Sequence, residues 1–227
     1  MKPNGLKNKT RENHKIDGLS PDANKLRGHS EIINVETLTK NIDLAWETTR
    51  TPAEFRSKLL VIFRTTLSEG SNFIQDRFLS NNDGAEAVLA QAYLMDSLIK
   101  AALETVDTKL YRAPNPTRGE QLCIIAVGGY GRGELAPFSD IDLLFLLPYK
   151  QTPRVEQVVE TILYLLWDMK LKVGHSTRSI DECMRQAKAD MTVRTAILES
   201  RYICGEISLM EQMIARFREE IIKGSAL

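Results

Sequence analysis

The chain has 227 residues, 43% of them hydrophobic, and its 30 basic residues balance its 30 acidic residues to a formal net charge of zero. This balance gives no general attraction to nucleic acid or to a membrane surface, and no apolar run approaches the roughly 18–20 residues of a membrane span. The three cysteines lack the paired spacing of a disulfide framework or a zinc site. We therefore expect a soluble cytoplasmic protein without nucleic-acid or membrane partners, in which a local site holds any charged ligand.

The first half of the chain is predicted to be helical after a polar tail. Residues 1–33 are rich in Lys, Asn and Gly, and we expect a disordered tail there. Apolar residues then recur at intervals of three and four along 55–79 and again along 85–110, which is the period of amphipathic helices. The segment Asn-Asn-Asp-Gly at 81–84 supplies capping residues between them. Residues 34–113 are therefore predicted to form a helical extension built on a pair of antiparallel helices.

After a boundary rich in proline and glycine at 111–120, the pattern changes to that of an α+β domain. Short apolar runs of β-forming residues predict strands at 121–127 and 140–148, and 171–179 is expected to be a third strand. Amphipathic patterns predict helices at 153–170, 180–205 and 206–223, the second of them broken near Asp190. Residues 114–227 are thus predicted to form the core, a small mixed sheet with C-terminal helices.

Two acidic residues, Asp140 and Asp142, fall on a segment that otherwise has the character of a buried strand. Side chains alternate along a strand, so both carboxylates are predicted to point to the same face. Two neighbouring carboxylates repel each other, and their burial without compensation costs several kcal/mol, about the scale of an unpaired buried charge. Magnesium removes this problem because it accepts one or two carboxylates together with substrate phosphates. We therefore predict that Asp140 and Asp142 are catalytic residues that bind Mg²⁺.

A glycine-rich bend precedes this strand and is predicted to bind phosphate. Gly128 and Gly129 follow the first strand, and glycine lets backbone N–H groups approach a phosphate without a Cβ in the way. A short helix is expected to begin within 131–138, Arg132 can hold a phosphate oxygen as a fork donor, and Ser139 can donate a hydroxyl hydrogen bond. A phosphate cradle facing a two-carboxylate metal site is the arrangement of a triphosphate clamp.

Other glycine motifs do not fit this segment. A Walker A loop needs Gly-Lys-Ser or Gly-Lys-Thr, and the chain contains neither. The dinucleotide fingerprint GxGxxG, set on Gly129 and Gly131, would need glycine where Glu134 stands. A tight turn beside a solvated edge strand would explain the glycines alone, but it leaves the paired aspartates unexplained.

The combination of a Gly-Gly bend and Asp-x-Asp about ten residues later resembles the nucleotidyltransferase superfamily related to DNA polymerase β. The segment GGYGRGELAPFSDIDLLFL is similar to the motif of bacterial PII uridylyltransferases, the GlnD family, and LWDMKLKVGHSTRS and DMTVRTAILESRYICG are also similar to that family. The similarity covers roughly residues 50–225. It implies a polymerase β-like fold and transfer of UMP from UTP to a tyrosine hydroxyl of the PII signalling protein, in nitrogen and glutamine signalling, with release of pyrophosphate. Gly128 and Gly129 would then border the triphosphate, and Asp140 and Asp142 would hold magnesium.

The sequence departs from the superfamily pattern at the third carboxylate, which is usual on a later strand. The segment 171–179 offers Gly174, His175 and Ser176 but no acid, and Asp168, Asp181 and Glu199 are the available substitutes. His175 is either a polar neighbour of the site or a core histidine. We predict that it contacts the nucleotide, because its strand should pass beside Asp142.

The chain is also shorter than GlnD-family enzymes, which carry an HD hydrolase domain and two ACT domains. The histidines are His14, His29 and His175, and no His-Asp metal pair is present. The resemblance therefore implies an N-terminal fragment or a truncated reading frame. Two other functions stay open: an adenylyltransferase acting on glutamine synthetase, because no residue here identifies the base, and a non-catalytic module that binds nucleotide or protein.

Overall fold

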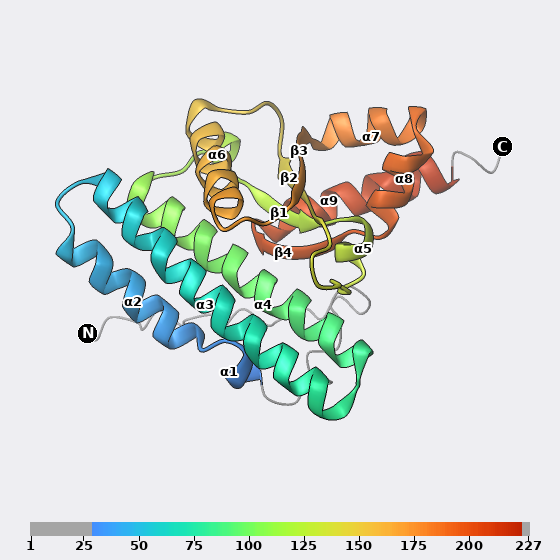
Figure 1. The fold of residues 1–227 in the computed structure, drawn as a ribbon. Helices are drawn as coiled ribbons and strands as arrows, with labels where there is room; N and C mark the ends of the chain where they lie inside the picture. Colours follow the sequence, from blue (N-terminus) through green and yellow to red (C-terminus); the bar gives the residue numbers. More distant parts are fainter. Residues whose placement is uncertain (1–28, 224–227) are drawn as a thin grey trace, which may run out of the picture.

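A computed structural model describes residues 29–223, which form a four-stranded mixed sheet with helices on both faces (Figure 1). The helices of the first half are α1 (His29–Ile32), α2 (Val35–Thr48), α3 (Pro52–Asn81) and α4 (Gly84–Thr105), with a π-helical turn at Val106–Leu110 and a 3₁₀ turn at Arg118–Glu120. The strands are β1 (Cys123–Ala126), β2 (Ile141–Leu147), β3 (Val173–Ser179) and β4 (Arg201–Gly205). The remaining helices are α5 (Gly128–Gly131), α6 (Pro153–Asp168), α7 (Ile180–Ala189), α8 (Met191–Leu198) and α9 (Ile207–Phe217), which continues as a π-helical segment at Arg218–Lys223.

The first helices form where their apolar period and caps predict them. The N-cap side chains of Asn34, Thr51 and Asp83 accept hydrogen bonds from the first turns of α2, α3 and α4. Asn82 ends α3 in a left-handed conformation with φ of 55°, so the predicted turn at 81–84 is confirmed. The structure adds α2 to the expected antiparallel pair of α3 and α4.

The N-terminal boundary differs from the prediction. Residues 1–28 of the predicted tail lie outside the described residues. Residues 29–32 form α1, and Ile32 and Ile33 are each only 4% exposed within the apolar cluster that α3 and α4 share. The predicted tail therefore extends too far, because these two apolar side chains bury their surface against the helices.

The sheet has the strand order β3-β2-β1-β4. β1 pairs antiparallel with β2 and β4, whereas β2 and β3 run parallel and are joined by the crossover helix α6. The three predicted strands are confirmed, and so is the break near Asp190. β4 was predicted as the end of a helix, and that prediction is wrong: Arg201–Gly205 adds an edge strand to β1, beyond the end of α8.

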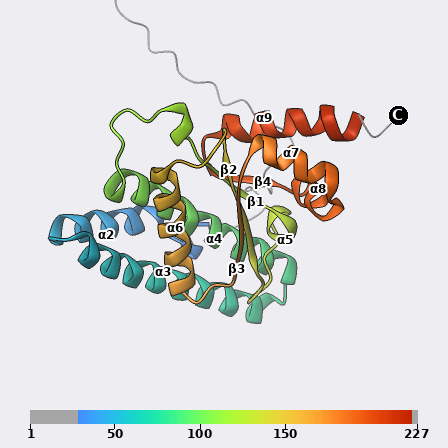
Figure 2. The same ribbon diagram turned by 90° about the horizontal axis from the view of Figure 1, so that it is seen from above.

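The two faces of the sheet pack against different helices, as Figures 1 and 2 show. Leu143, Phe145 and Leu147 of β2 belong to the apolar cluster that includes α2, α3, α4 and α6. Leu144 and Leu146 belong to a second cluster with α7, α8 and α9. The α+β fold class is confirmed, and by strand alternation Asp142 faces the side of α7–α9.

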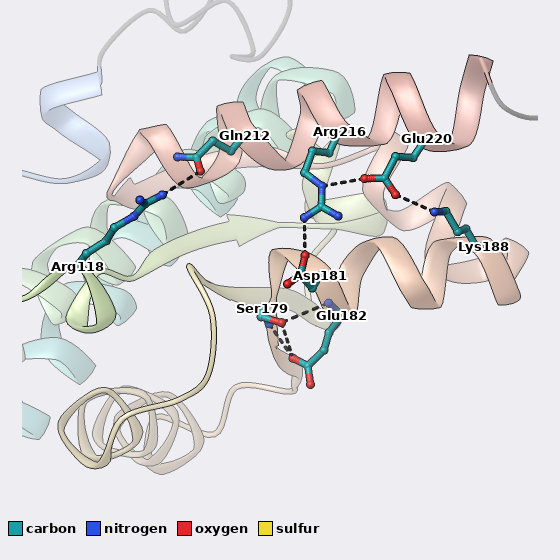
Figure 3. A network of polar contacts seen from close by, with 8 residues as sticks. All are labelled: Arg118, Ser179, Asp181, Glu182, Lys188, Gln212, Arg216 and Glu220. Carbon is teal, nitrogen blue, oxygen red and sulfur yellow. Dashed lines mark hydrogen bonds and ion pairs between the residues drawn. The ribbon is translucent and has the colours of Figure 1, made fainter.

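Polar contacts attach α7 to β3 and α9 (Figure 3). Ser179 ends β3 and forms a capping box with Glu182, in which each side chain accepts from the backbone N–H of the other residue. Arg216 of α9 donates to Asp181 and to Glu220, and Lys188 pairs with the same Glu220. These surface pairs each contribute little energy, but together they fix α7 and α9 over one face of the sheet.

The helices and the cysteines were compared with the requirements of a membrane span and of a reactive thiol. Within residues 29–223, none of the helices combines the length and the apolar content needed to cross a bilayer. All three cysteines are free thiols; Cys123 and Cys183 are buried and Cys204 is half-buried. Burial raises the pKa of Cys183 to about 11, so this thiol is a packing residue rather than a nucleophile.

Candidate active site

The Asp142 carboxylate lies between two glycines that come from different parts of the fold. β3 pairs Gly174 directly opposite Asp142, and a Cβ at Gly174 would overlap Oδ1 of Asp142. On the other side, a Cβ at Gly128 would lie 3.4 Å from Oδ2. Gly128 also has a φ of 61°, a conformation that side chains disfavour. Gly174 therefore leaves the space that this carboxylate occupies, whereas glycine is required at position 128 by its backbone conformation.

Asp140 is exposed and stands one residue before β2 rather than on it, so the prediction that both acids lie on the strand is wrong for Asp140. The two carboxylates still act on each other. Partial burial, and then the charge of Asp140, raise the pKa of Asp142 above its ordinary value. A carboxylate pair whose repulsion is not relieved by a neighbouring cation is a donor set suited to a hard divalent ion.

The glycine bend forms its own short helix, α5. Val127 precedes it, and the N–H of Gly131 donates to the carbonyl of Val127. The expected helix within 131–138 is wrong: the helical turn is Gly128–Gly131, because the positive φ of Gly128 turns the chain directly after β1. The first N–H groups of such a turn have no intrahelical acceptor and remain available to an anion.

A cleft of about 430 Å³ opens beside Asp142 between the sheet and α8. Its walls include Gly128, Asp142 and Gly174, together with polar side chains that the sequence reasoning did not assign: Ser176, Arg178, Thr192 and Thr195. Ser176 and Arg178 alternate with Gly174 along β3, so they share the face of Asp142. Ser176 and Arg178 can be assigned to this face only when the parallel register of β2 and β3 is known.

Two predicted phosphate-binding residues have other surroundings in this structure. Arg132 is half exposed and donates to Glu199 at 2.9 Å, with Glu134 at 3.7 Å. Glu199 lines the cleft, so the guanidinium is next to the cleft but already paired. Ser139 is exposed and lines a separate apolar cavity between α3 and α4, away from the cleft residues. Phosphate binding by Arg132 and by Ser139 therefore stays a prediction, and for Arg132 it would require the guanidinium to leave Glu199.

His175 follows Gly174 on β3, so strand alternation directs its side chain away from the face that carries Asp142. β3 pairs His175 with Leu143, whose side chain is in the α6 cluster, and the His175 ring contacts Trp167 with centroids 5.6 Å apart. The backbone of β3 does pass beside Asp142, as expected. By strand alternation the ring is on the face opposite Asp142, but His175 is also among the residues that line the cleft. Contact between His175 and the nucleotide therefore stays a prediction.

The structure does not bring a third acid to the pair. Among residues 29–223, no three His, Cys, Asp or Glu side chains are arranged to hold a metal ion. Asp181 is paired with Arg216 (Figure 3), and the backbone carbonyl of Asp168 accepts from Arg64. Of the three substitutes considered, Glu199 alone lines the cleft, where it is paired with Arg132.

Gly131 provides a stability test of the contact between α5 and α8. A Cβ at this buried position would overlap the backbone carbonyl of Glu199. Because backbone atoms cannot rotate away, we expect Gly131→Ala to lower the free energy of unfolding by about 1–3 kcal/mol, the usual cost of overpacking. Urea unfolding followed by circular dichroism measures this, and a variant as stable as the wild type would contradict the contact.

Comparison with known proteins connects this geometry to a family. Residues 117–203 match the model of a nucleotidyltransferase domain. The chain is 51% identical over 172 residues to a bifunctional uridylyltransferase/uridylyl-removing enzyme of Azospirillum brasilense, covering 76% of this chain and 18% of that protein. Proteins of the same name from Rhodospirillum rubrum and Rhodopseudomonas palustris are each 45% identical, over 88% and 81% of this chain and 22% and 20% of theirs.

The matched domain runs from before β1 into β4, and it therefore includes the glycine bend, both aspartates and the strand that carries Gly174. The chain spans about a fifth of the length of the curated relatives it matches. The resemblance inferred from the sequence motifs is confirmed by these identities. The chain carries a nucleotidyltransferase domain and is a homologue of the bifunctional uridylyltransferase/uridylyl-removing enzymes.

Proposed function

We propose that this domain transfers UMP from magnesium-bound UTP to a tyrosine hydroxyl of a PII nitrogen-regulatory protein and releases pyrophosphate. The observation that carries the proposal is the Asp142 carboxylate, enclosed by Gly128 and Gly174 and repelled by Asp140, in a domain homologous to uridylyltransferases. The choice of UTP, of PII and of tyrosine rests on that homology, because no side chain of the cleft identifies a base.

The residues present fit a magnesium ion. Asp140 and Asp142 would hold it as carboxylate ligands, and Mg²⁺ commonly takes its other ligands from phosphate oxygens and water. When bound, magnesium would neutralise the triphosphate and favour the ionised form of the attacking hydroxyl. The N–H groups at the start of α5, beside Asp142, would orient the phosphate oxygens.

The protein's contribution to the reaction is then positioning and electrostatics. In the proposed reaction the tyrosine oxygen bonds to the α-phosphorus, the bond to the bridging oxygen breaks, and pyrophosphate leaves with that electron pair while the phenolic proton is released. Phosphoryl-type transfers need the attacking and leaving oxygens in line, with little other chemistry from the protein. The rigid seat of Asp142 on β2 suits that requirement, since its neighbours in the strand are buried.

Two other functions differ from this one in measurable ways. An adenylyltransferase would use ATP in place of UTP, and a non-catalytic module would fold and fail to transfer either nucleotide. The homologues that match most of this chain are named uridylyltransferases, which favours UTP.

Asp140→Asn tests the proposed reaction. We expect transfer of α-labelled UMP onto purified PII to disappear in this variant, while its unfolding midpoint stays close to that of the wild type, because Asp140 is exposed and asparagine keeps its volume. Asp76→Asn on α3, also exposed and outside the cleft, is the matched control and should transfer normally. Equal transfer by wild type and Asp140→Asn would refute the assignment of Asp140 to the active site. Transfer from ATP but not from UTP would identify the domain as an adenylyltransferase instead.

A further inference from the structure

A buried cluster of three polar side chains joins the helical extension to the glycine bend. Asp96 of α4 accepts a hydrogen bond of 2.6 Å from the hydroxyl of Tyr130, which is in the bend. Arg201, at the start of β4, donates to both carboxylate oxygens of Asp96. The side chain of Arg201 is 6% exposed and that of Asp96 is 14% exposed, so this ion pair is nearly out of contact with water.

Arg201 also contacts the bend itself. Its Nη2 donates to the backbone carbonyl of Tyr130 at 3.2 Å, and its guanidinium lies 5.3 Å from the centroid of the Tyr130 ring. β4 pairs Arg201 with Ala126, the last residue of β1 before the bend. Asp96 thus contacts the hydroxyl of Tyr130, and Arg201 contacts its ring and its backbone carbonyl. These two residues are 34 and 71 positions away from Tyr130 in the sequence.

Stability alone explains this cluster poorly. Replacing a buried ion pair by apolar residues of similar volume is often neutral or stabilising, because the two charges must leave water. Here the pair is also incomplete, since Nε of Arg201 is buried and has no hydrogen-bond partner in the described structure. What the cluster can do is orient Tyr130, which is 1% exposed and whose hydroxyl donates to Asp96.

The bend needs such an anchor because glycine leaves its backbone free. Gly128, Gly129 and Gly131 surround Tyr130, and glycine restricts φ and ψ less than any other residue. Gly128 must nevertheless stay next to the Asp142 carboxylate, so close that a Cβ at this glycine would touch Oδ2. Tyr130 is the only residue of Gly128–Gly131 with a side chain that can hold the segment in place.

We propose that Asp96 is a positioning residue of the nucleotide site, which through Tyr130 and Arg201 holds the glycine bend against Asp142. This inference rests on the proposed function for its effect on the nucleotide, but its effect on the bend is independent of any ligand. It makes the helical extension part of the active-site framework, since α4 supplies the carboxylate.

The test is Tyr130→Phe in the full chain, with two measurements. This variant loses the hydrogen bond to Asp96 and keeps the ring and the Arg201–Asp96 pair. The first measurement is hydrogen exchange of the amides of Gly131, Arg132 and Gly133, which close the bend, in the absence of nucleotide. The second is the affinity for UTP with magnesium, measured by calorimetry. Tyr111→Phe is the matched control, because its hydroxyl contacts Arg56 and Thr161, far along the chain from the bend.

We expect exchange in the bend to become faster and UTP affinity to fall, each by about threefold to tenfold, the effect of losing one hydrogen bond. Tyr111→Phe should change neither. Unchanged exchange and unchanged affinity in Tyr130→Phe would overturn the inference. Faster exchange in a chain whose wild type binds no UTP would uphold the anchoring of the bend and refute the proposed function instead.

Asp96→Asn gives a second, stronger perturbation of the same cluster. Asparagine can still accept from Tyr130, but it leaves the charge of Arg201 uncompensated. We expect larger effects on both measurements than in Tyr130→Phe. If this variant does not fold, Tyr130→Phe still decides between the outcomes, because it leaves the ion pair intact.

Discussion

Asp142→Asn is expected to abolish magnesium-dependent UTP binding while making the metal-free chain slightly more stable at neutral pH. Loss of a residue that only supports a metal ligand typically lowers metal affinity by about 10–100-fold, so loss of the ligand itself should exceed about 100-fold. The gain in stability follows from the raised pKa of Asp142, which means that the folded chain disfavours its charged form.

The stability difference between Asp142→Asn and the wild type is expected to depend on pH. Below the ordinary pKa of 3.8 the carboxyl is protonated in both the folded and the unfolded chain, and its charge costs nothing. As the pH rises through the raised pKa of the folded state, the wild type loses stability that asparagine keeps. Because Asp142 is partly in water, we expect a gap of at most about 1 kcal/mol. Urea unfolding of both chains at several pH values measures this gap. If the stability of Asp142→Asn relative to wild type fell as the pH rose from acid to neutral, the unfavourable burial of the Asp142 charge and its repulsion by Asp140 would be contradicted.

Gly174→Ala is expected to weaken magnesium-dependent UTP binding by at least about tenfold without touching a proposed ligand. The new methyl group would lie 2.2 Å from Oδ1 of Asp142, which is an overlap, so either the carboxylate must rotate or β3 must move away from β2. Overpacking of this kind also costs about 1–3 kcal/mol of stability. Calorimetry with UTP and magnesium measures the first effect, and urea unfolding measures the second.

Gly84→Ala is the matched control for this substitution. It adds the same methyl group at the start of α4, where no atom lies within 4 Å of the new Cβ. We expect this variant to bind UTP as the wild type does. If Gly174→Ala also bound UTP normally from a folded chain, the position of the Asp142 carboxylate between the two glycines would not matter for the site.

The sequence predicts the elements of this fold well where local patterns decide them. The apolar periods of α3, α4 and α6 and the apolar runs of β1 and β2 were sufficient, because each of these elements buries one regular stripe or run. β4 was missed because its five residues directly follow a helical pattern and contain no turn signal before Arg201. Its strand conformation comes from pairing with β1, which is a tertiary effect.

The sequence predicts only those parts of the candidate site that depend on local patterns. The Asp-x-Asp spacing and the glycine bend are local, and the structure brings Asp142 and Gly128 together. Gly174 and His175 could not be told apart from the sequence, because only the register of β3 against β2 decides which of them lies directly opposite Asp142. The anchor formed by Asp96, 34 residues before Tyr130, leaves no signal in the sequence at all.

Calorimetric titration of UTP into the wild-type chain, with magnesium and with a chelator, tests whether this chain assembles a magnesium-dependent triphosphate clamp. We expect UTP binding to require magnesium and to be lost in Asp140→Asn, whose circular dichroism spectrum should match that of the wild type. Binding that is equally strong without magnesium, or that survives in Asp140→Asn, would contradict the assignment of the two aspartates. A folded wild-type chain that binds no UTP in either condition would contradict the claim that residues 1–227 suffice to form the clamp.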